Sequence, residues 1–341
     1  MTAVEPDLAA GLARVVADGG LESPAVEVVG IASAGATRRT LFLTVESAGH
    51  TIPAVAQISG PQLMQVGMTV EDEAQLVRLA ESAGVPVATV LGASNDDAAV
   101  GGPVVVSKRI DGPTIPRHVL RLLDASPDVR EVLIAHCGDA LAKLHSADIE
   151  LAPETLPRLD AERPAESYVP QLHDTLDRID ARYPVLRYGL RWLTEHLPTP
   201  APAPTIVHGD FRNGNLIVNE AGLGAVLDWE LAHIGDPMED LAYLCMRTWR
   251  FGADDYPAGG FGSFDQLREA YESAGGTWRD DAFRWWMTAR TAWWGIGLAF
   301  QADNFLKGTS NSIVHAASGR RVVELEYDLL QLIESQTLQS S

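Results

Sequence analysis

The stretch that decides the fold is HGDFRNGNLIV, residues 208–218, followed by VLDWE at residues 226–230. An apolar run ends just before it and another begins after Asn215, so Asp210 is expected on a loop at the end of a strand. Turn residues at 220–222 then reverse the chain and bring Asp228 beside Asn215. The pattern therefore predicts two carboxylates and one amide in a single pocket.

This set of side chains suits phosphoryl transfer. Mg²⁺ prefers carboxylate and carbonyl oxygens together with phosphate oxygens, and Asn215 and Asp228 can supply the first two kinds. Asp210 is then free to orient an attacking hydroxyl group and to accept its proton. In such a site the protein works mainly by positioning and by charge neutralisation.

The predicted secondary structure changes near residue 111. Before it, short β-like runs alternate with turns around a single predicted helix at 70–82, and after it long helical patterns dominate. The strands of the first part are expected at 26–31, 40–45, 52–58, 87–91 and 104–108. We predict an α+β, two-lobed architecture, with a small five-stranded antiparallel lobe at 1–111, a mainly helical lobe at 112–341 and a ligand cleft between them. The helices of the second lobe are expected at 129–145, 170–182, 187–196, 239–247, 264–273, 280–302 and 318–333.

Three motifs carry a family resemblance: His-Gly-Asp-x-x-x-x-Asn, the Asp-Trp-Glu that begins thirteen residues after that Asn, and Gly-Asp-Pro-x-x-Asp-Leu at 235–241. Together they resemble the aminoglycoside phosphotransferase family of protein-kinase-like small-molecule kinases. The subgroup that looks most similar is the kinase domain associated with acyl-CoA dehydrogenases. The resemblance implies ATP as phosphoryl donor, Mg²⁺ as cofactor and a small molecule with a hydroxyl group as acceptor.

The resemblance also implies residue roles. Asp210 would be the catalytic base, and Asn215 and Asp228 the metal ligands. Glu230 follows Asp228 by two residues, and it either assists the metal or orders the loop on the substrate side. Arg290 is expected to line the acceptor side.

The nucleotide side departs from the family pattern. The third strand of the small lobe should carry a cation for the phosphates, paired to a glutamate on the next helix, and Glu73 is the natural partner. Gln57 stands where Lys or Arg is expected. In one alternative, Arg38 or Arg39, close to the phosphate-approaching turn at Gly35, replaces the missing charge. In the other, the chain is a degenerate kinase-like binding module with weak or no nucleotide turnover.

The flanking residues are expected to have structural roles. His208 should shape the catalytic loop through backbone hydrogen bonds, while Asp236 and Asp240 should cap the helix near Met238 and brace that loop. The acceptor stays open between a cationic amino sugar or amino alcohol and an anionic hydroxy acid or acyl-CoA. Core packing is the interpretation for Trp229, Trp285, Trp286, Trp293 and Trp294.

Composition narrows the class of protein. The 341 residues are 46% hydrophobic and 21% charged, which is typical of a globular protein, and the formal charge is −20. Such a charge disfavours nucleic acid and anionic membranes as partners. Cys137 and Cys245 are too few for a disulfide framework, and the absence of His-rich spacing disfavours a metal-dependent hydrolase. No signal peptide or membrane-spanning run is apparent, so a cytoplasmic location is expected.

Overall fold

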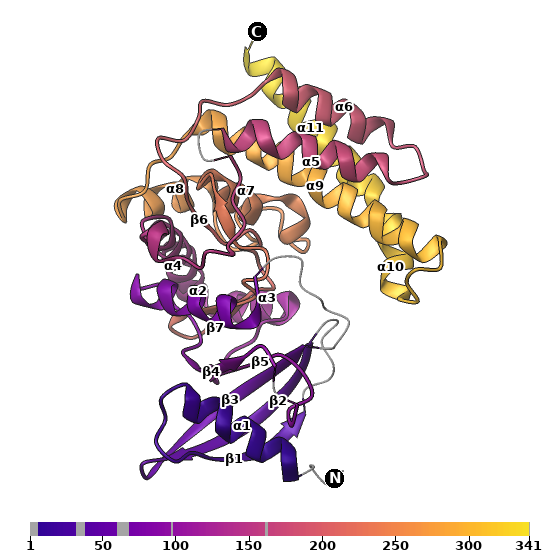
Figure 1. The fold of residues 1–341 in the computed structure, drawn as a ribbon. Coiled ribbons are helices and arrows are strands. Elements are labelled where there is room, and N and C mark those ends of the chain that lie inside the picture. Colours follow the sequence, from indigo (N-terminus) through magenta and orange to yellow (C-terminus); the bar gives the residue numbers. More distant parts are fainter. Residues whose placement is uncertain (1–5, 32–37, 60–67, 97, 161–162, 341) are drawn as a thin grey trace.

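The computed structural model describes residues 6–31, 38–59, 68–96, 98–160 and 163–340. Its small lobe holds a five-stranded antiparallel sheet in the order β1-β2-β3-β5-β4, at the bottom of Figure 1. The strands are β1 (Ala25–Ile31), β2 (Arg38–Ser47), β3 (His50–Ser59), β4 (Val90–Ser94) and β5 (Val104–Lys108). This confirms the predicted sheet, except that the fourth strand begins three residues later than expected.

The two faces of this sheet have different neighbours. Along β2, Leu41, Leu43 and Val45 are buried, whereas Thr40 and Phe42 alternate with them and are only partly buried. The buried face packs on a helix, α1 (Pro6–Asp18), through residues Leu8, Leu12, Val15 and Val16.

The helix α1 was not expected, although the apolar spacing of its buried residues is a helical signal. The chain approaches this helix closely at Gly92 in β4, where an added Cβ would lie 2.2 Å from the Val15 carbonyl oxygen. A side chain at this position would push the strand away from the helix. The missing side chain of Gly92 therefore fixes the spacing between α1 and the sheet.

The helix α2 (Val70–Ser82) has the predicted bounds and lies between the sheet and the helical lobe (Figure 1). A capping box starts it, because Thr69 accepts a hydrogen bond from the Asp72 backbone N–H while Asp72 accepts one from Thr69. Its apolar residues belong to the large core cluster rather than to the cluster beneath α1. As a result, Glu73 on α2 is held at the junction of the two lobes.

The remainder of the chain is mainly helical, with two small antiparallel sheets in which β6 (Thr205–Val207) pairs with β9 (His233–Gly235) and β7 (Leu216–Asn219) pairs with β8 (Gly222–Val226). The helix expected at 170–182 begins six residues earlier and contains Pro170 in its interior. The helix α3 was not expected. The α-helices of this lobe are α3 (Pro116–Ala125), α4 (Pro127–His145), α5 (Pro164–Asp177), α6 (Pro184–Glu195), α7 (Met238–Cys245), α8 (Phe264–Ser273), α9 (Asp280–Leu306), α10 (Ile313–Ser318) and α11 (Val322–Ser340).

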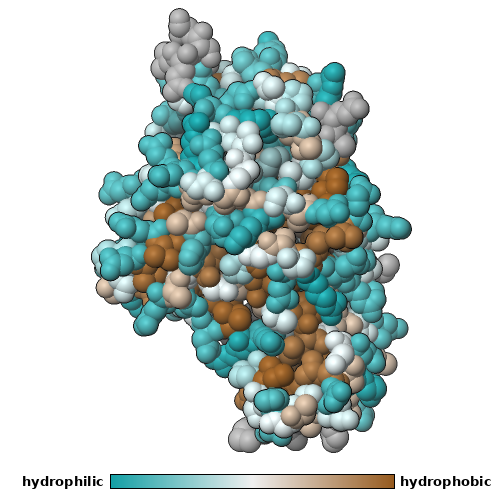
Figure 2. Space-filling model, turned by 90° about the vertical axis from the view of Figure 1, so that its left-hand side faces the viewer, coloured by the Kyte–Doolittle hydropathy of each residue, from teal (hydrophilic) through white to brown (hydrophobic). Residues whose placement is uncertain are grey.

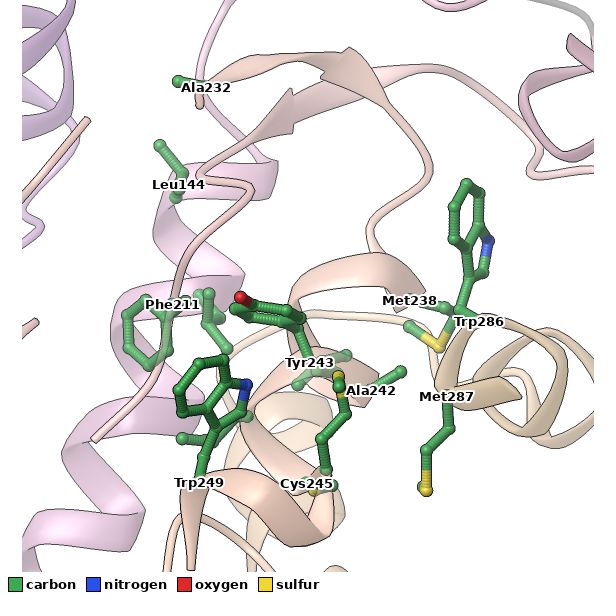
Figure 3. Close-up of a cluster of buried hydrophobic side chains, with 14 of the residues drawn as sticks. Leu144, Phe211, Ala232, Met238, Ala242, Tyr243, Cys245, Trp249, Trp286 and Met287 are labelled. Carbon is green, nitrogen blue, oxygen red and sulfur yellow. The ribbon is translucent and has the colours of Figure 1, made fainter. Parts of the chain in front are cut away.

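The core of the helical lobe is rich in aromatic residues. Trp285 and Trp286 on α9 are fully buried, which confirms their structural interpretation. In Figure 3, Trp286 lies near Met238, and Trp249 lies beside Tyr243 with a ring separation of 5.4 Å. The two cysteines, Cys137 and Cys245, are free and buried as expected, and burial raises the pKa of each thiol.

Hydrophilic residues cover much of the face shown in Figure 2, and hydrophobic residues gather there in separate patches. Among the described residues, no helix is both long and apolar enough to cross a membrane.

Candidate active site

The loop after β6 is shaped by a buried histidine. His208 Nδ1 accepts a hydrogen bond from the Asp210 backbone N–H (3.1 Å), and Nε2 therefore carries the proton that it donates to the Leu227 carbonyl (3.1 Å). Burial lowers the pKa of His208, which also favours the neutral ring. Gly209 has φ +77°, and a Cβ there would lie 2.3 Å from the Leu231 carbonyl oxygen. The His-Gly-Asp triplet thus sets a tight turn that presents Asp210.

A fully buried carboxylate braces the same turn. Asp240 accepts hydrogen bonds from the backbone N–H groups of His208 (2.7 Å) and Gly209 (2.9 Å), and it contacts His145 at 3.2 Å. Burial acts to raise the pKa of Asp240, but the bonds from His145 and His208 hold it below its ordinary value. Asp236 accepts a hydrogen bond from Met238 N–H (2.9 Å) at the start of α7. The predicted capping and bracing roles are confirmed and fall to Asp236 and Asp240 respectively.

Arg290 supports the loop from below. It is 3% exposed, and its guanidinium donates to the Gly209 carbonyl (2.5 Å), to Glu239 (2.9 Å) and to the Tyr168 hydroxyl (3.0 Å). Tyr243 also packs against it, with the guanidinium 4.4 Å from the ring. The expectation that Arg290 lines the acceptor side is therefore corrected: its charge is used inside the protein.

Asp210 is held by its own loop. One carboxylate oxygen accepts from Arg212 Nε (2.9 Å) and the other from Asn215 Nδ2 (2.5 Å), which also donates to the Asp210 carbonyl (3.1 Å). Because the Asn215 amide nitrogen is used in this way, its oxygen stays available for a cation.

The sequence analysis overlooked Arg212, although a basic residue two positions after Asp210 on one loop is a usable signal. Its guanidinium lies 4.4 Å from the Trp249 ring. Arg212 is only partly buried, so it combines a fixed position with access to a ligand beside Asp210.

The β7–β8 hairpin places Asp228 next to this group, as the turn pattern predicted. Leu227 N–H donates to the Asn215 carbonyl (2.8 Å), and Asp228 follows with φ +67°, in the left-handed region. Partial desolvation of its carboxylate and the nearby carboxylates of Glu230 and Asp210 raise the pKa of Asp228 to about 6. A cation would relieve this repulsion, so the residues fit a magnesium site.

Few side chains at this point can bind a metal ion. The described residues contain no group of three or more His, Cys, Asp or Glu side chains arranged around one metal position. Asn215 and Asp228 can therefore hold Mg²⁺ only with oxygens from another source, such as nucleotide phosphates. Glu230 follows Asp228 by two residues, and partial desolvation of its carboxylate together with its acidic neighbours raises its pKa despite the opposing charge of Arg38.

Across the cleft, the structure brings together Arg38 and Glu73. Arg38 donates from two nitrogens to the two carboxylate oxygens of Glu73, at 3.1 and 2.5 Å. Burial acts to lower the pKa of Arg38, but Glu73 raises it above its ordinary value. Arg39 is exposed on β2 and is not part of this pair, and Gly35 lies outside the described residues.

A cavity of about 420 Å³ lies where the two lobes meet. Gln57 and Glu73 line it from the small lobe, and Asp228 lines it from the helical lobe. Residues 107–112, which connect the lobes, close one side. The apolar part of the lining consists of Phe42, Val55, Val70, Ala74, Val77, Ala88, Val90, Val105, Ile110, Ile217, Val226, Leu227 and Trp229.

The sequence is similar to known proteins over much of its length. Residues 28–285 match the sequence model of the family described as "Phosphotransferase enzyme family". Acyl-CoA dehydrogenase family member 10 from Mus musculus is 31% identical over 199 residues, which are 55% of this chain and 17% of that protein. Acyl-CoA dehydrogenase family member 11 from Gallus gallus is 29% identical over 219 residues, 62% of this chain and 27% of that protein. The chain thus spans less than a third of the length of these curated relatives.

Solved structures share the whole fold. A Ralstonia eutropha protein assigned to the aminoglycoside phosphotransferases superposes with a TM-score of 0.74 and 20% identity, covering 96% of this chain and 98% of the other. Macrolide 2′-phosphotransferase type I gives a TM-score of 0.60 and 20% identity over 94% and 99% of the two chains. An aminoglycoside phosphotransferase in complex with ADP and hygromycin B gives 0.57 and 16% over 91% and 95%. These likenesses confirm the two-lobed, protein-kinase-like fold.

Proposed function

The chain belongs to the phosphotransferase enzyme family, and on that premise we propose that it transfers the γ-phosphoryl group of ATP to a hydroxyl group of a small molecule. The observation that carries the proposal is that Asp210 and Asn215 are hydrogen-bonded to each other beside Asp228, which lines the cavity together with Glu73. In a phosphotransferase such a cleft binds the nucleotide between the lobes, with the acceptor beside the catalytic carboxylate.

Asp210 is the proposed catalytic base. Its carboxylate is fixed on both oxygens, by Arg212 and by Asn215, so an acceptor hydroxyl would meet it in one orientation. Asp210 orients this hydroxyl and accepts its proton as the oxygen attacks phosphorus. Arg212 lies beside the same carboxylate, where its charge can also stabilise a phosphoryl group in transfer.

Asn215, through its amide oxygen, and Asp228, through its carboxylate, would hold Mg²⁺. When bound, the ion neutralises negative charge on the phosphates. The protein supplies the fixed positions of both ligands, because the Asn215 amide is anchored on Asp210 and Leu227 is bonded to the Asn215 backbone. The negative charge of Asp228, Glu230 and Asp210 favours a cation at this point.

A second candidate is a kinase-like binding module with weak or no turnover. Gln57 favours it, because this neutral side chain lines the cavity at the position where the family pattern places a cation. Loss of one charge-assisted contact weakens binding by roughly 1.5–3 kcal/mol, or about tenfold to a hundredfold. Such a loss lowers affinity for the nucleotide but leaves the catalytic residues in place, so we favour the enzyme.

The test is Asp210→Asn. Hydroxylated small molecules are incubated with the protein and Mg·ATP, and phosphorylated products are detected by mass spectrometry. We expect the wild type to form a product and Asp210→Asn to form it about 10²- to 10⁴-fold more slowly, because the base is lost. Mg·ATP affinity should stay within a few-fold of the wild type.

The matched control is Asp255→Asn, which removes an exposed carboxylate and should leave turnover unchanged. Equal turnover in the wild type and Asp210→Asn would refute the assignment of the base. Tight Mg·ATP binding without product from any acceptor would favour the binding module.

A further inference from the structure

The cavity face of β3 lacks a charge. Val55 and Gln57 line the cavity, whereas Ala54, Ala56 and Ile58 alternate with them and are buried in the small-lobe core. Gln57 is therefore correctly placed to reach a ligand in the cavity, and it is neutral. A phosphate on this side of the cleft needs a cation from another element.

The neighbouring strand supplies one. In the β2–β3 ladder Thr40 is opposite Gln57, and Arg38 is opposite Ser59. Side chains two apart on a strand point to the same face, so Arg38 extends the face of Thr40 and Phe42, about 7 Å beyond Thr40. Both of those residues line the cavity.

Arg39 does not share this position. It alternates with Arg38 and lies on the same face as Leu41 and Leu43, which pack into the small-lobe core. It is exposed at the end of that face. Arg38 therefore lies on the face of the sheet that borders the cavity and Arg39 on the opposite face, so Arg39 is the matched control for Arg38.

Arg38 is fixed by Glu73 on α2. The two side chains form a two-point ion pair and are each 11% exposed. Asp228 and Glu230 also act on the Arg38 charge from the opposite lobe. A guanidinium has five N–H donors and Glu73 uses two of them, so donors remain for phosphate oxygens.

Two other cations line the cavity, but they lie towards its connecting segment. Lys108 is opposite Ala54 on β3, three residues or about 10 Å along the strand from Gln57. Arg109 pairs with Asp111 at 3.1 Å and lies over the Phe42 ring. Neither is placed beside Glu73.

We propose that Arg38 has taken over the task of the missing third-strand cation: held by Glu73, it contacts the phosphates of the bound nucleotide. Arg38 is then a substrate-binding residue and Glu73 a positioning residue. The inference rests on the proposed function, since it requires that the cavity binds a nucleotide.

The test moves the charge back to the third strand. Mg·ATP is titrated calorimetrically into the wild type, Arg38→Gln, Arg39→Gln and the double variant Arg38→Gln/Gln57→Lys. We expect Arg38→Gln to raise Kd about tenfold to a hundredfold, Arg39→Gln to change it less than about twofold, and the double variant to recover at least about tenfold of the loss. Recovery identifies the charge, rather than the arginine side chain, as the important property.

Folding is controlled separately. Arg38→Gln leaves Glu73 without its partner, so Arg38→Gln/Glu73→Gln, which removes both charges, is titrated as well and should lose affinity by the same factor. Thermal unfolding of each variant shows that it is folded. If the wild type binds Mg·ATP and both Arg38→Gln and Arg38→Gln/Glu73→Gln bind it with the same Kd, the role of Arg38 alone is overturned. Absence of Mg·ATP binding by the wild type would overturn the proposed function together with this inference.

Discussion

The two walls of the cleft are built in different ways. The loop wall, residues 206–241, holds the Asp210 carboxylate through short-range contacts such as those from His208 and Arg212. The sheet wall, formed by β2, β3 and α2, depends on one ion pair between Arg38 and Glu73, 35 residues apart. The loop wall therefore needs particular residues in a fixed order, whereas the sheet wall needs a charge that several strand positions can supply.

Of the substitutions that distinguish the two walls, we expect the largest effect at Arg290, which supports the loop wall. Arg290→Met keeps much of the side-chain volume but removes the arginine partner of the fully buried Glu239, which then keeps its contact with His233, and it removes the Arg290 donor to the Gly209 carbonyl. Breaking a buried pair in this way costs about 3–5 kcal/mol. We expect the free energy of unfolding, measured in urea, to fall by this amount, and the rate of phosphoryl transfer to fall with it.

The exposed Arg284 on the same helix is the matched control, and Arg284→Met should change stability by less than about 0.5 kcal/mol. Adding Glu239→Gln to Arg290→Met removes the buried carboxylate charge that lost its arginine partner, so part of the stability should return. Equal stability of Arg290→Met and the wild type would show that the loop wall does not depend on the contacts of Arg290 with Glu239 and Gly209.

A smaller effect comes from His233, which contacts Glu239 at 3.0 Å. Burial acts to lower the pKa of His233, but Glu239 outweighs it and raises the pKa above its ordinary value. The stabilisation from the charged pair is therefore complete below about pH 6.5 and is lost as pH rises through the folded-state pKa.

We expect His233→Gln to destabilise the protein more at pH 6 than at pH 9, with a difference on the order of 1 kcal/mol, as for a charge-assisted hydrogen bond. Urea unfolding of the two proteins at both pH values measures this difference directly. The same loss at both pH values would mean that Glu239 does not raise the pKa of His233 in the folded protein.

The loop wall was largely predictable from sequence, because the contacts that bring Asp210, Asn215 and Asp228 together join residues that are close along the chain. The spacing of Asp210, Asn215 and Asp228, with a turn between two short strands, was enough to predict that they meet. The structure adds Arg212, which the sequence pattern did not single out. It also shows that Arg290 supports the loop from within the protein and does not reach towards a ligand. Burial decided that role, and burial of one side chain on a long helix depends on the packing of the whole lobe.

The sheet wall was only partly predictable. The strands and α2 follow from periodicity and from the turn residues that bound them. The partner of Glu73 depends on the β2–β3 register, which places Arg38 rather than Arg39 on the cavity face. One residue of register exchanges the two faces of a strand, so the sequence alone left both arginines as alternatives.

The most direct test of the account is a calorimetric titration with ATP, with and without Mg²⁺, of the wild type and of Asp228→Asn. The account predicts metal-dependent binding by the wild type and about tenfold or greater weakening in Asp228→Asn, because the variant loses a charged ligand on the loop wall. Binding that is independent of Mg²⁺ and unchanged in Asp228→Asn, or no binding at millimolar ATP, would contradict it.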